Sequence, residues 1–221
     1  MKSVKCVAIA IICLVLSSCT KTVVTKYPDG AVQSTIHYKF GKENGKSVYF
    51  FQHPNTVEIE VEMKNGKRHG EFFRYFVNGN LDTHCTYVKD SIEGKEVIYT
   101  PNGELSEENT YVRGKKNGPH KVYHVTGELQ IEGNYKDGMF DGDWTYYDDR
   151  GIVVGEGKFD AGTGDVISFD KNGVKNRSTH YVNNKKDGKE IYFTPDGKVY
   201  KEIIYKQDRI TSQSVDSTLI P

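Results

Sequence analysis

The chain has 221 residues with 30 basic and 30 acidic side chains, so its formal net charge is zero. This balance does not favour binding to nucleic acid, because recognition of a phosphate backbone normally requires a basic patch. The 15 tyrosines and 10 phenylalanines contrast with only four leucines after residue 18. Such a composition favours β-strands over packed helices.

Residues 1–18 differ from the rest of the chain. Lys2 and Lys5 form a basic start, and residues 7–16 are a continuous apolar run that leads through two serines to Cys19. A basic start, a short apolar segment and small residues before a cleavage point are typical of a secretory signal. The run is shorter than the roughly 17 to 25 residues that cross a bilayer. We therefore predict a signal peptide over residues 1–18.

The sequence Leu16-Ser17-Ser18-Cys19 resembles the lipobox of bacterial lipoproteins. The resemblance implies that Cys19 receives a diacylglycerol thioether, that the chain is cut before it, and that the new amine is acylated. Residues 19–26 would then be the lipidated cysteine and a short tether. The next residue is Thr20 and not the aspartate that usually retains such proteins at the inner membrane, so the resemblance favours the outer membrane. Cys85 is left without a disulfide partner, and we interpret it as a structural thiol.

Residues 27–205 carry a repeat of about 24 residues. The first glycine series has spacings of 25, 24, 24, 24, 22 and 24 and consists of Gly45, Gly70, Gly94, Gly118, Gly142, Gly164 and Gly188. The second glycine series is Gly79, Gly103, Gly127, Gly151, Gly173 and Gly197. The first aromatic series is Tyr75, Tyr99, Tyr123, Tyr147, Phe169 and Phe193. The second is Tyr38, Met63, Tyr87, Tyr111, Tyr135, Phe159, Tyr181 and Tyr205, with the methionine in one aromatic slot.

Each repeat unit consists of two short apolar runs and two turns. Pro101-Asn102-Gly103 is a turn signal, and Asn65-Gly66 at the opposite end is typical of a two-residue hairpin. We predict an all-β fold, an elongated antiparallel meander of stacked β-hairpins that spans residues 27–205. Residues 206–221 would add a terminal strand or a polar tail. The two residues missing between Phe159 and Gly164 predict a tighter turn in that repeat.

Units such as Tyr111 to Gly118 followed by Tyr123 to Leu129 resemble the variant MORN repeats of bacteria. The resemblance covers roughly residues 27–205, and proteins built from such repeats are often labelled YwqK-type antitoxin components. It implies a β-hairpin array that contacts protein or lipid. It brings no catalytic residues, because the motif contains structural glycines and aromatics only. The chain departs from the eukaryotic pattern, which is richer in tryptophan, because Trp144 is its only one.

Candidate chemistry beyond the repeat is sparse. His120 and His124 are four apart, which on a strand places both on one face, but no repeat supplies a third ligand. The sequence has no nucleophile elbow, P-loop or dinucleotide fingerprint, and we assign every glycine to the repeat. We therefore expect a non-catalytic protein with neither cofactor nor metal.

The first aromatic series is the candidate binding surface, because if it faces outward it forms an apolar stripe with hydroxyl tips. The alternative is that these rings only pack the sheet. We predict a lipid-anchored envelope protein whose repeat array is a scaffold for a protein partner. Two alternatives stay open: an antitoxin-like protein that neutralises a toxin, and a glycan- or peptidoglycan-binding module, against which the single tryptophan counts.

Overall fold

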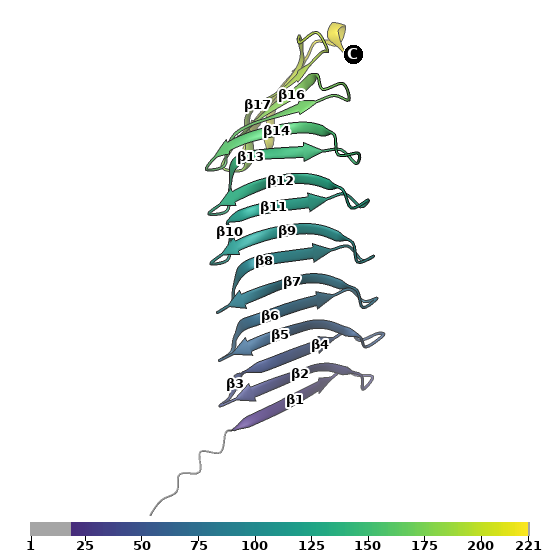
Figure 1. The fold of residues 1–221 in the computed structure, drawn as a ribbon, viewed down its shortest axis with the longest axis vertical. Helices are drawn as coiled ribbons and strands as arrows, with labels where there is room; N and C mark the ends of the chain where they lie inside the picture. The colour runs from purple at the N-terminus through teal and green to yellow at the C-terminus, as the bar shows by residue number, and fades with distance from the viewer. Residues whose placement is uncertain (1–18, 221) are drawn as a thin grey trace, which may run out of the picture.

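The computed structural model describes residues 19–220, so the predicted signal peptide lies outside the described residues. These residues form one antiparallel sheet of 19 strands, followed by a short 3-10 helix at Ser217–Leu219 (Figure 1). Strands that are neighbours in sequence pair with each other. The structure thus confirms the predicted all-β meander of stacked hairpins.

The strands are β1 Thr20–Lys26, β2 Val32–Lys39, β3 Lys42–Glu43, β4 Gly45–Phe50, β5 Val57–Lys64, β6 Lys67–Tyr75, β7 Leu81–Val88, β8 Ser91–Tyr99, β9 Leu105–Val112, β10 Lys115–Lys116, β11 Gly118–Tyr123, β12 Leu129–Lys136, β13 Met139–Tyr147, β14 Val153–Asp160, β15 Thr163–Phe169, β16 Lys175–Val182, β17 Lys185–Phe193, β18 Val199–Lys206 and β19 Arg209–Val215. β3 and β4 both pair with β2, and β10 and β11 both pair with β9, so each of these couples occupies one strand position. Towards the C-terminal end the strands twist out of the plane of the first hairpins (Figure 1).

The predicted tether is wrong from Thr20 onward, because residues Thr20–Lys26 form β1. This strand pairs with β2 from Thr20 opposite Lys39 to Lys26 opposite Val32. The segment is rich in threonine and valine, which favour extended backbone. The sheet therefore begins directly after Cys19. At the other end, residues 206–221 contain β19, which is exposed along its whole length.

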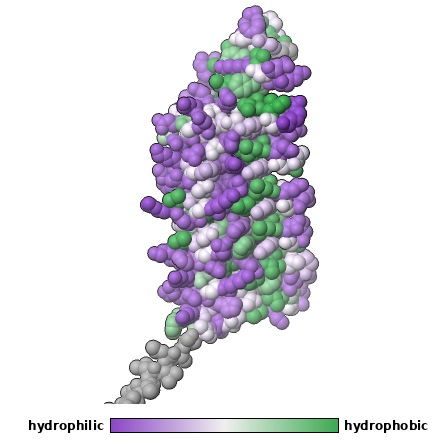
Figure 2. Space-filling model, viewed as in Figure 1, coloured by the Kyte–Doolittle hydropathy of each residue, from purple (hydrophilic) through white to green (hydrophobic). Residues whose placement is uncertain are grey.

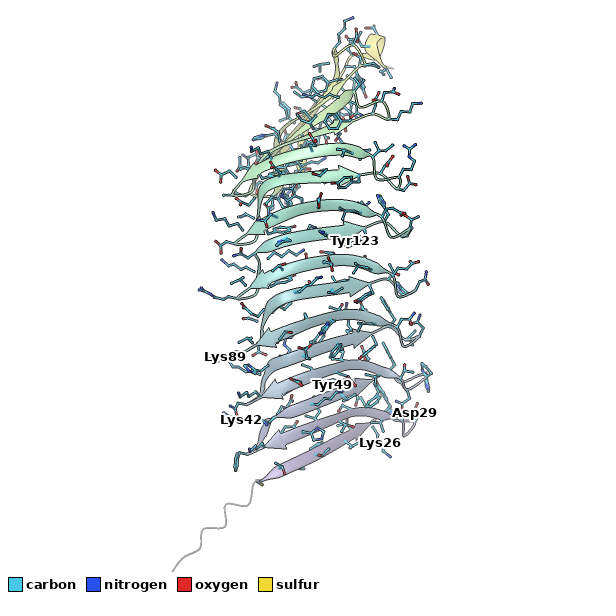
Figure 3. The ribbon with its side chains drawn as sticks, in the orientation of Figure 1. Lys26, Asp29, Lys42, Tyr49, Lys89 and Tyr123 are labelled. Carbon is cyan, nitrogen blue, oxygen red and sulfur yellow. The ribbon has the colours of Figure 1, made fainter. Side chains whose placement is uncertain are left out.

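The two kinds of turn lie at opposite edges of the sheet. Lys42 and Lys89 mark one edge, and Asp29 marks the other (Figure 3). On the side of Lys42 and Lys89, two-residue turns such as Asn65-Gly66 have positive φ at both positions, 55° and 78°. On the side of Asp29, the Gly103 N–H donates to the Thr100 carbonyl at 2.8 Å, and the glycine has a φ of 85°. Both geometries favour the residues that the sequence places there.

Bulges explain the first glycine series. Val61 pairs with Phe72 but Met63 pairs with Arg68, so β6 contains two extra residues, and Gly70 within them has a φ of 122°. In most hairpins a step of two residues on one strand lies opposite a step of four residues on its partner in the same way. Positive φ is costly for residues with a side chain, so the bulge selects glycine.

The prediction of a tighter turn in the shortened repeat is wrong. Its turn, Ala161-Gly162, keeps two residues with positive φ. β14 and β15 pair from Asp160–Thr163 to Gly155–Ser168 without a register shift. The two missing residues therefore remove the bulge and leave the turn intact. Gly164 is needed for a different reason, since an added Cβ would lie 2.0 Å from the Lys158 carbonyl oxygen.

One face of the sheet, the inner face, contains most of the buried side chains. A row through the middle of the strands on this face consists of Val61, Phe72, Cys85, Glu96, Asn109, His120, Gly133, Trp144, Gly157, Val166, Thr179, Glu190 and Ile203. Its apolar core is a cluster around Trp144, Phe159 and Val166. Figure 2 shows apolar side chains gathered in a band along the sheet between hydrophilic edges.

Three glycines around this cluster belong to neither series, so assigning every glycine to the repeat is wrong. They are Gly133, Gly155 and Gly157. A Cβ at Gly157 would lie 2.9 Å from Phe159 Cε2 and 3.1 Å from Val166 Cγ2. Because these glycines have no side chain, the large side chains of neighbouring strands can pack over them on the inner face.

Candidate functional site

The first aromatic series lies on the outer face, opposite the buried row. The Tyr123 hydroxyl donates to Glu108 at 3.2 Å, and the Tyr147 hydroxyl donates to Glu132 at 2.6 Å. The hydrogen bond with Glu132 raises the pKa of Tyr147. All six rings of the series are half-buried. The candidate binding surface is therefore a row of partly covered rings, two of which are tied to carboxylates.

Sequence reasoning missed a row of glutamates on the same outer face. They are Glu60, Glu108, Glu132, Glu156 and Glu202, with His84 and Ser178 in the two remaining slots. The 24-residue spacing was the signal that could have revealed them. Several are in ion pairs, such as Glu60 with Lys46 at 2.6 Å and Glu202 with Lys189 at 3.1 Å. Glu60, Glu108 and Glu202 each pair with a lysine, so ion pairs neutralise part of the row.

A groove with a volume of about 660 Å³ opens on the inner face across β12 to β18. Its aromatic lining consists of Tyr146, Tyr147, Phe169, Tyr181, Tyr192 and Tyr200. Gly155 pairs with Tyr146 on one side and Ser168 on the other, and its lack of a side chain leaves room for the Tyr146 ring. Of the predicted binding surface, only Tyr147 and Phe169 border this groove, at strand ends where the pairing register shifts.

The polar lining of the groove is Gln130, Ser168, Asn176 and Arg177, and it includes no acidic residue. Arg177 Nη2 donates to Ser168 Oγ at 3.2 Å, while its Nε is buried with no hydrogen-bond partner among the described residues. Burial raises the pKa of Tyr146 to about 12. Arg177 is the one lysine, arginine, aspartate or glutamate among the residues that line the groove.

A polar network is buried on the inner face beside the apolar core. Asn109 is 1% exposed; its Oδ1 accepts from His120 Nδ1 at 2.8 Å, and its Nδ2 donates to Glu96 at 3.0 Å. Burial, with Lys116 nearby, lowers the pKa of His120. His124 lies beyond the end of β11, and its ring contacts the Tyr147 carbonyl at 3.0 Å. The two histidines thus do not share one strand.

The two cysteines of the described residues have opposite environments. Cys19 is exposed immediately before β1. Cys85 is 1% exposed on β7, and burial raises the pKa of its thiol to about 11. Within residues 19–220, no group of three or more His, Cys, Asp or Glu is arranged to hold a metal ion. Across the same residues, no helix is long and apolar enough to cross a membrane.

The sequence profile of the family described as MORN repeat variant matches residues 92–113, 116–137 and 186–207. Each matched stretch corresponds to one repeat unit, as β8 with β9, β11 with β12, and β17 with β18 illustrate. The chain therefore carries MORN-variant repeats and is a β-hairpin repeat protein. The central stretch between the last two matches contains Trp144 and most of the groove lining.

No curated protein matches the chain. Among solved structures, one described as "Crystal Structure of TcdB2-TccC3-TEV" is similar over 90% of this chain, with 9% identity and a TM-score of 0.24. The match covers 15% of that chain.

Proposed function

We propose that the protein is a non-catalytic binding scaffold, anchored to the bacterial outer membrane through lipid on Cys19. The observation that carries the binding role is the groove across β12 to β18, where aromatic side chains surround an arginine that has no carboxylate partner among the described residues. It has the size of an ordinary ligand pocket, which typically measures roughly 300 to 1,000 Å³. The matched MORN-variant repeats flank this groove on both sides in the continuous sheet.

The position of Cys19 supports the anchoring role. This residue is exposed and directly precedes β1, so a lipid attached there would hold the first edge of the sheet at the membrane. The hairpins then stack away from that edge in chain order (Figure 1). At about 4.8 Å per strand, β14 and the groove lie roughly 50 Å along the sheet from β1. The array would therefore act as a spacer that presents the groove away from the lipid surface.

Anchoring is tested by metabolic labelling of the full chain and its Cys19→Ser variant with palmitate in a bacterial host, followed by membrane fractionation. The matched control is Cys85→Ala, which removes the other described cysteine. We expect label and outer-membrane retention in the wild type and in the control, and loss of both in Cys19→Ser. Stable retention requires two or three acyl chains, since one gives only marginal binding.

An unlabelled, soluble wild-type protein would overturn the anchored scaffold. That outcome would favour the antitoxin-like alternative, in which the array binds a toxin in the cytoplasm. A labelled protein in the inner membrane would retain the anchor and correct the compartment. The glycan-binding alternative is favoured by one specific observation, the combination of tyrosines, side-chain amides and one arginine in the groove.

A further inference from the structure

The groove lies where the sheet departs most from its repeat. On the inner face, the position that Gly155 occupies on β14 carries Ile131 on β12 and Arg177 on β16. The missing side chain leaves room for the ring of Tyr146, whose Cδ2 would lie 3.4 Å from an added Cβ. An added Cβ would lie 3.2 Å from the Ile167 carbonyl oxygen, so the close approach of the chain also disfavours a larger residue.

Arg177 is the unusual group in this hollow. Its one side-chain hydrogen bond among the described residues goes to Ser168, and it takes part in no ion pair there. Arg74 provides the contrast, because it occupies the same row of the inner face and its Nε pairs with Asp82 at 2.5 Å. A partly desolvated cation without a counter-ion is costly. A carboxylate on a ligand would remove that cost by pairing with the guanidinium.

The remaining polar groups suit hydroxyl-bearing rings. The side-chain amides of Gln130 and Asn176 line the groove, and neither makes a hydrogen bond within the described residues. Tyr146, Tyr192 and Tyr200 add flat faces, with Tyr192 and Tyr200 packed edge to face at 6.1 Å. Aromatic faces bind the apolar faces of sugar rings, and side-chain amides bind their hydroxyls.

The sheet itself disfavours an extended peptide in this place. β13 to β17 each pair on both sides, so their backbone N–H and C=O groups are engaged within the sheet. A peptide laid across them would find no free edge to extend, which is the usual source of main-chain hydrogen bonds in strand addition. A saccharide needs no such edge, because side chains satisfy its hydroxyl groups.

We propose that this groove binds an acidic saccharide, whose carboxylate pairs with Arg177 and whose ring faces stack on the tyrosines. The inference rests on the proposed binding role of the array and names the ligand class for it. It does not depend on the lipid anchor.

The test is a binding panel of oligosaccharides that contain uronic, sialic or muramic acid residues, with the methyl ester of each as the neutral partner. The protein is the full chain as purified from the expressing bacterium, and binding is measured by titration calorimetry. We expect at least one acidic member to bind, and its methyl ester to bind at least about tenfold more weakly. Trp144, close to the groove, supplies a second readout through its fluorescence.

Arg177→Gln should weaken binding of the acidic saccharide to the level of the ester, and Arg177→Lys should fall between the two. Arg74→Gln is the matched control and should bind as the wild type does. Circular dichroism and Trp144 fluorescence establish whether each variant is folded. If Arg177→Gln does not fold, Arg177→Lys still tests the proposal.

Absence of binding across the panel would overturn the proposal, as would equal binding of acid and ester or an unchanged affinity in both Arg177 variants. Such failures would leave palmitate labelling of Cys19 untouched, so the two proposals fail separately. Binding of an acidic peptide in place of the saccharides would retain Arg177 as the anion site but overturn the ligand class.

Discussion

The indole of Trp144 covers Gly133 on the neighbouring strand. A Cβ added at Gly133 would lie 2.2 Å from Trp144 Cδ2 and 2.5 Å from Cε2. Trp144 is 3% exposed, with the ring of Phe140 at 4.6 Å and that of Tyr135 at 5.2 Å. The largest side chain of the thin inner core thus depends on a neighbour that has no side chain.

We expect Gly133→Ala to destabilise the protein by roughly 1–3 kcal/mol, because the methyl group overpacks a filled site whose ring cannot move away. In a Trp144→Leu background the same glycine substitution should cost less, since the smaller side chain gives the methyl group room. Urea unfolding followed by circular dichroism measures both effects. Asn134→Ala, at the next position on β12, is the control and should change stability less. Equal stability of Gly133→Ala and wild type would contradict the close packing.

The shortened repeat predicts how other hairpins tolerate deletions. β14 and β15 show that a hairpin folds without the two-residue bulge. Deleting Ile92 and Glu93 together from β8 should therefore keep the faces of the strand in register and leave a folded protein. Deleting Ile92 alone should be more damaging, because an odd shift turns the following side chains to the opposite face. Thermal unfolding of the two variants tests the order, and a more stable single deletion would refute it.

The thiol of Cys85 should be inert in the folded protein. It is 1% exposed and its pKa is raised to about 11 by burial, so almost no reactive thiolate exists near neutral pH. In the Cys19→Ser variant, we expect no alkylation of Cys85 by iodoacetamide at pH 8 until urea unfolds the chain. Mass spectrometry of the tryptic peptide measures the modification. Rapid labelling of the native protein would contradict the buried position.

The repeat spacing is a local signal, which is why the fold class and both kinds of turn could be predicted. Asn65-Gly66 and Pro101-Asn102-Gly103 each specify a turn through their own backbone preferences. A spacing of 24 residues also places equivalent side chains on one face, so the outer row that contains Glu108 and Glu132 could have been found. The strand at Thr20–Lys26 was missed because it precedes the apparent repeat over residues 27–205, although its partner, Val32–Lys39, lies within that repeat.

The groove and the polar networks could not be predicted, because they depend on which residues face each other across strands. Bulges shift that register by one or two residues in every hairpin except the shortened one. The contact between Asn109 and His120 could be predicted only if such a register shift were already known. Arg177 likewise is one of many basic residues in the sequence, and only the structure shows that it forms no ion pair within residues 19–220.

The buried carboxylate of Glu190 should give the protein a pH-dependent stability. Glu190 is 1% exposed and accepts from Lys186 at 2.8 Å, Thr179 at 3.1 Å and Tyr205 at 3.1 Å. Burial alone would raise the pKa of this carboxyl, but its donors outweigh burial and the net shift is downward. An unfolded glutamate titrates near pH 4.3. The stabilisation is therefore complete above that pH and is lost as the pH falls through the lower folded value.

We expect the free energy of unfolding to decrease below about pH 4.3, and Glu190→Gln to reduce that decrease. At pH 7 the same substitution should cost roughly 1–3 kcal/mol, because a buried, charge-assisted hydrogen-bond network loses its acceptor charge while Lys186 keeps its own. Urea unfolding at several pH values measures both quantities. Glu202→Gln on the neighbouring strand is the matched control, since its carboxylate pairs with Lys189 on the exposed outer row and contributes little. An identical acid response in wild type and Glu190→Gln would place the pH dependence elsewhere in the sheet.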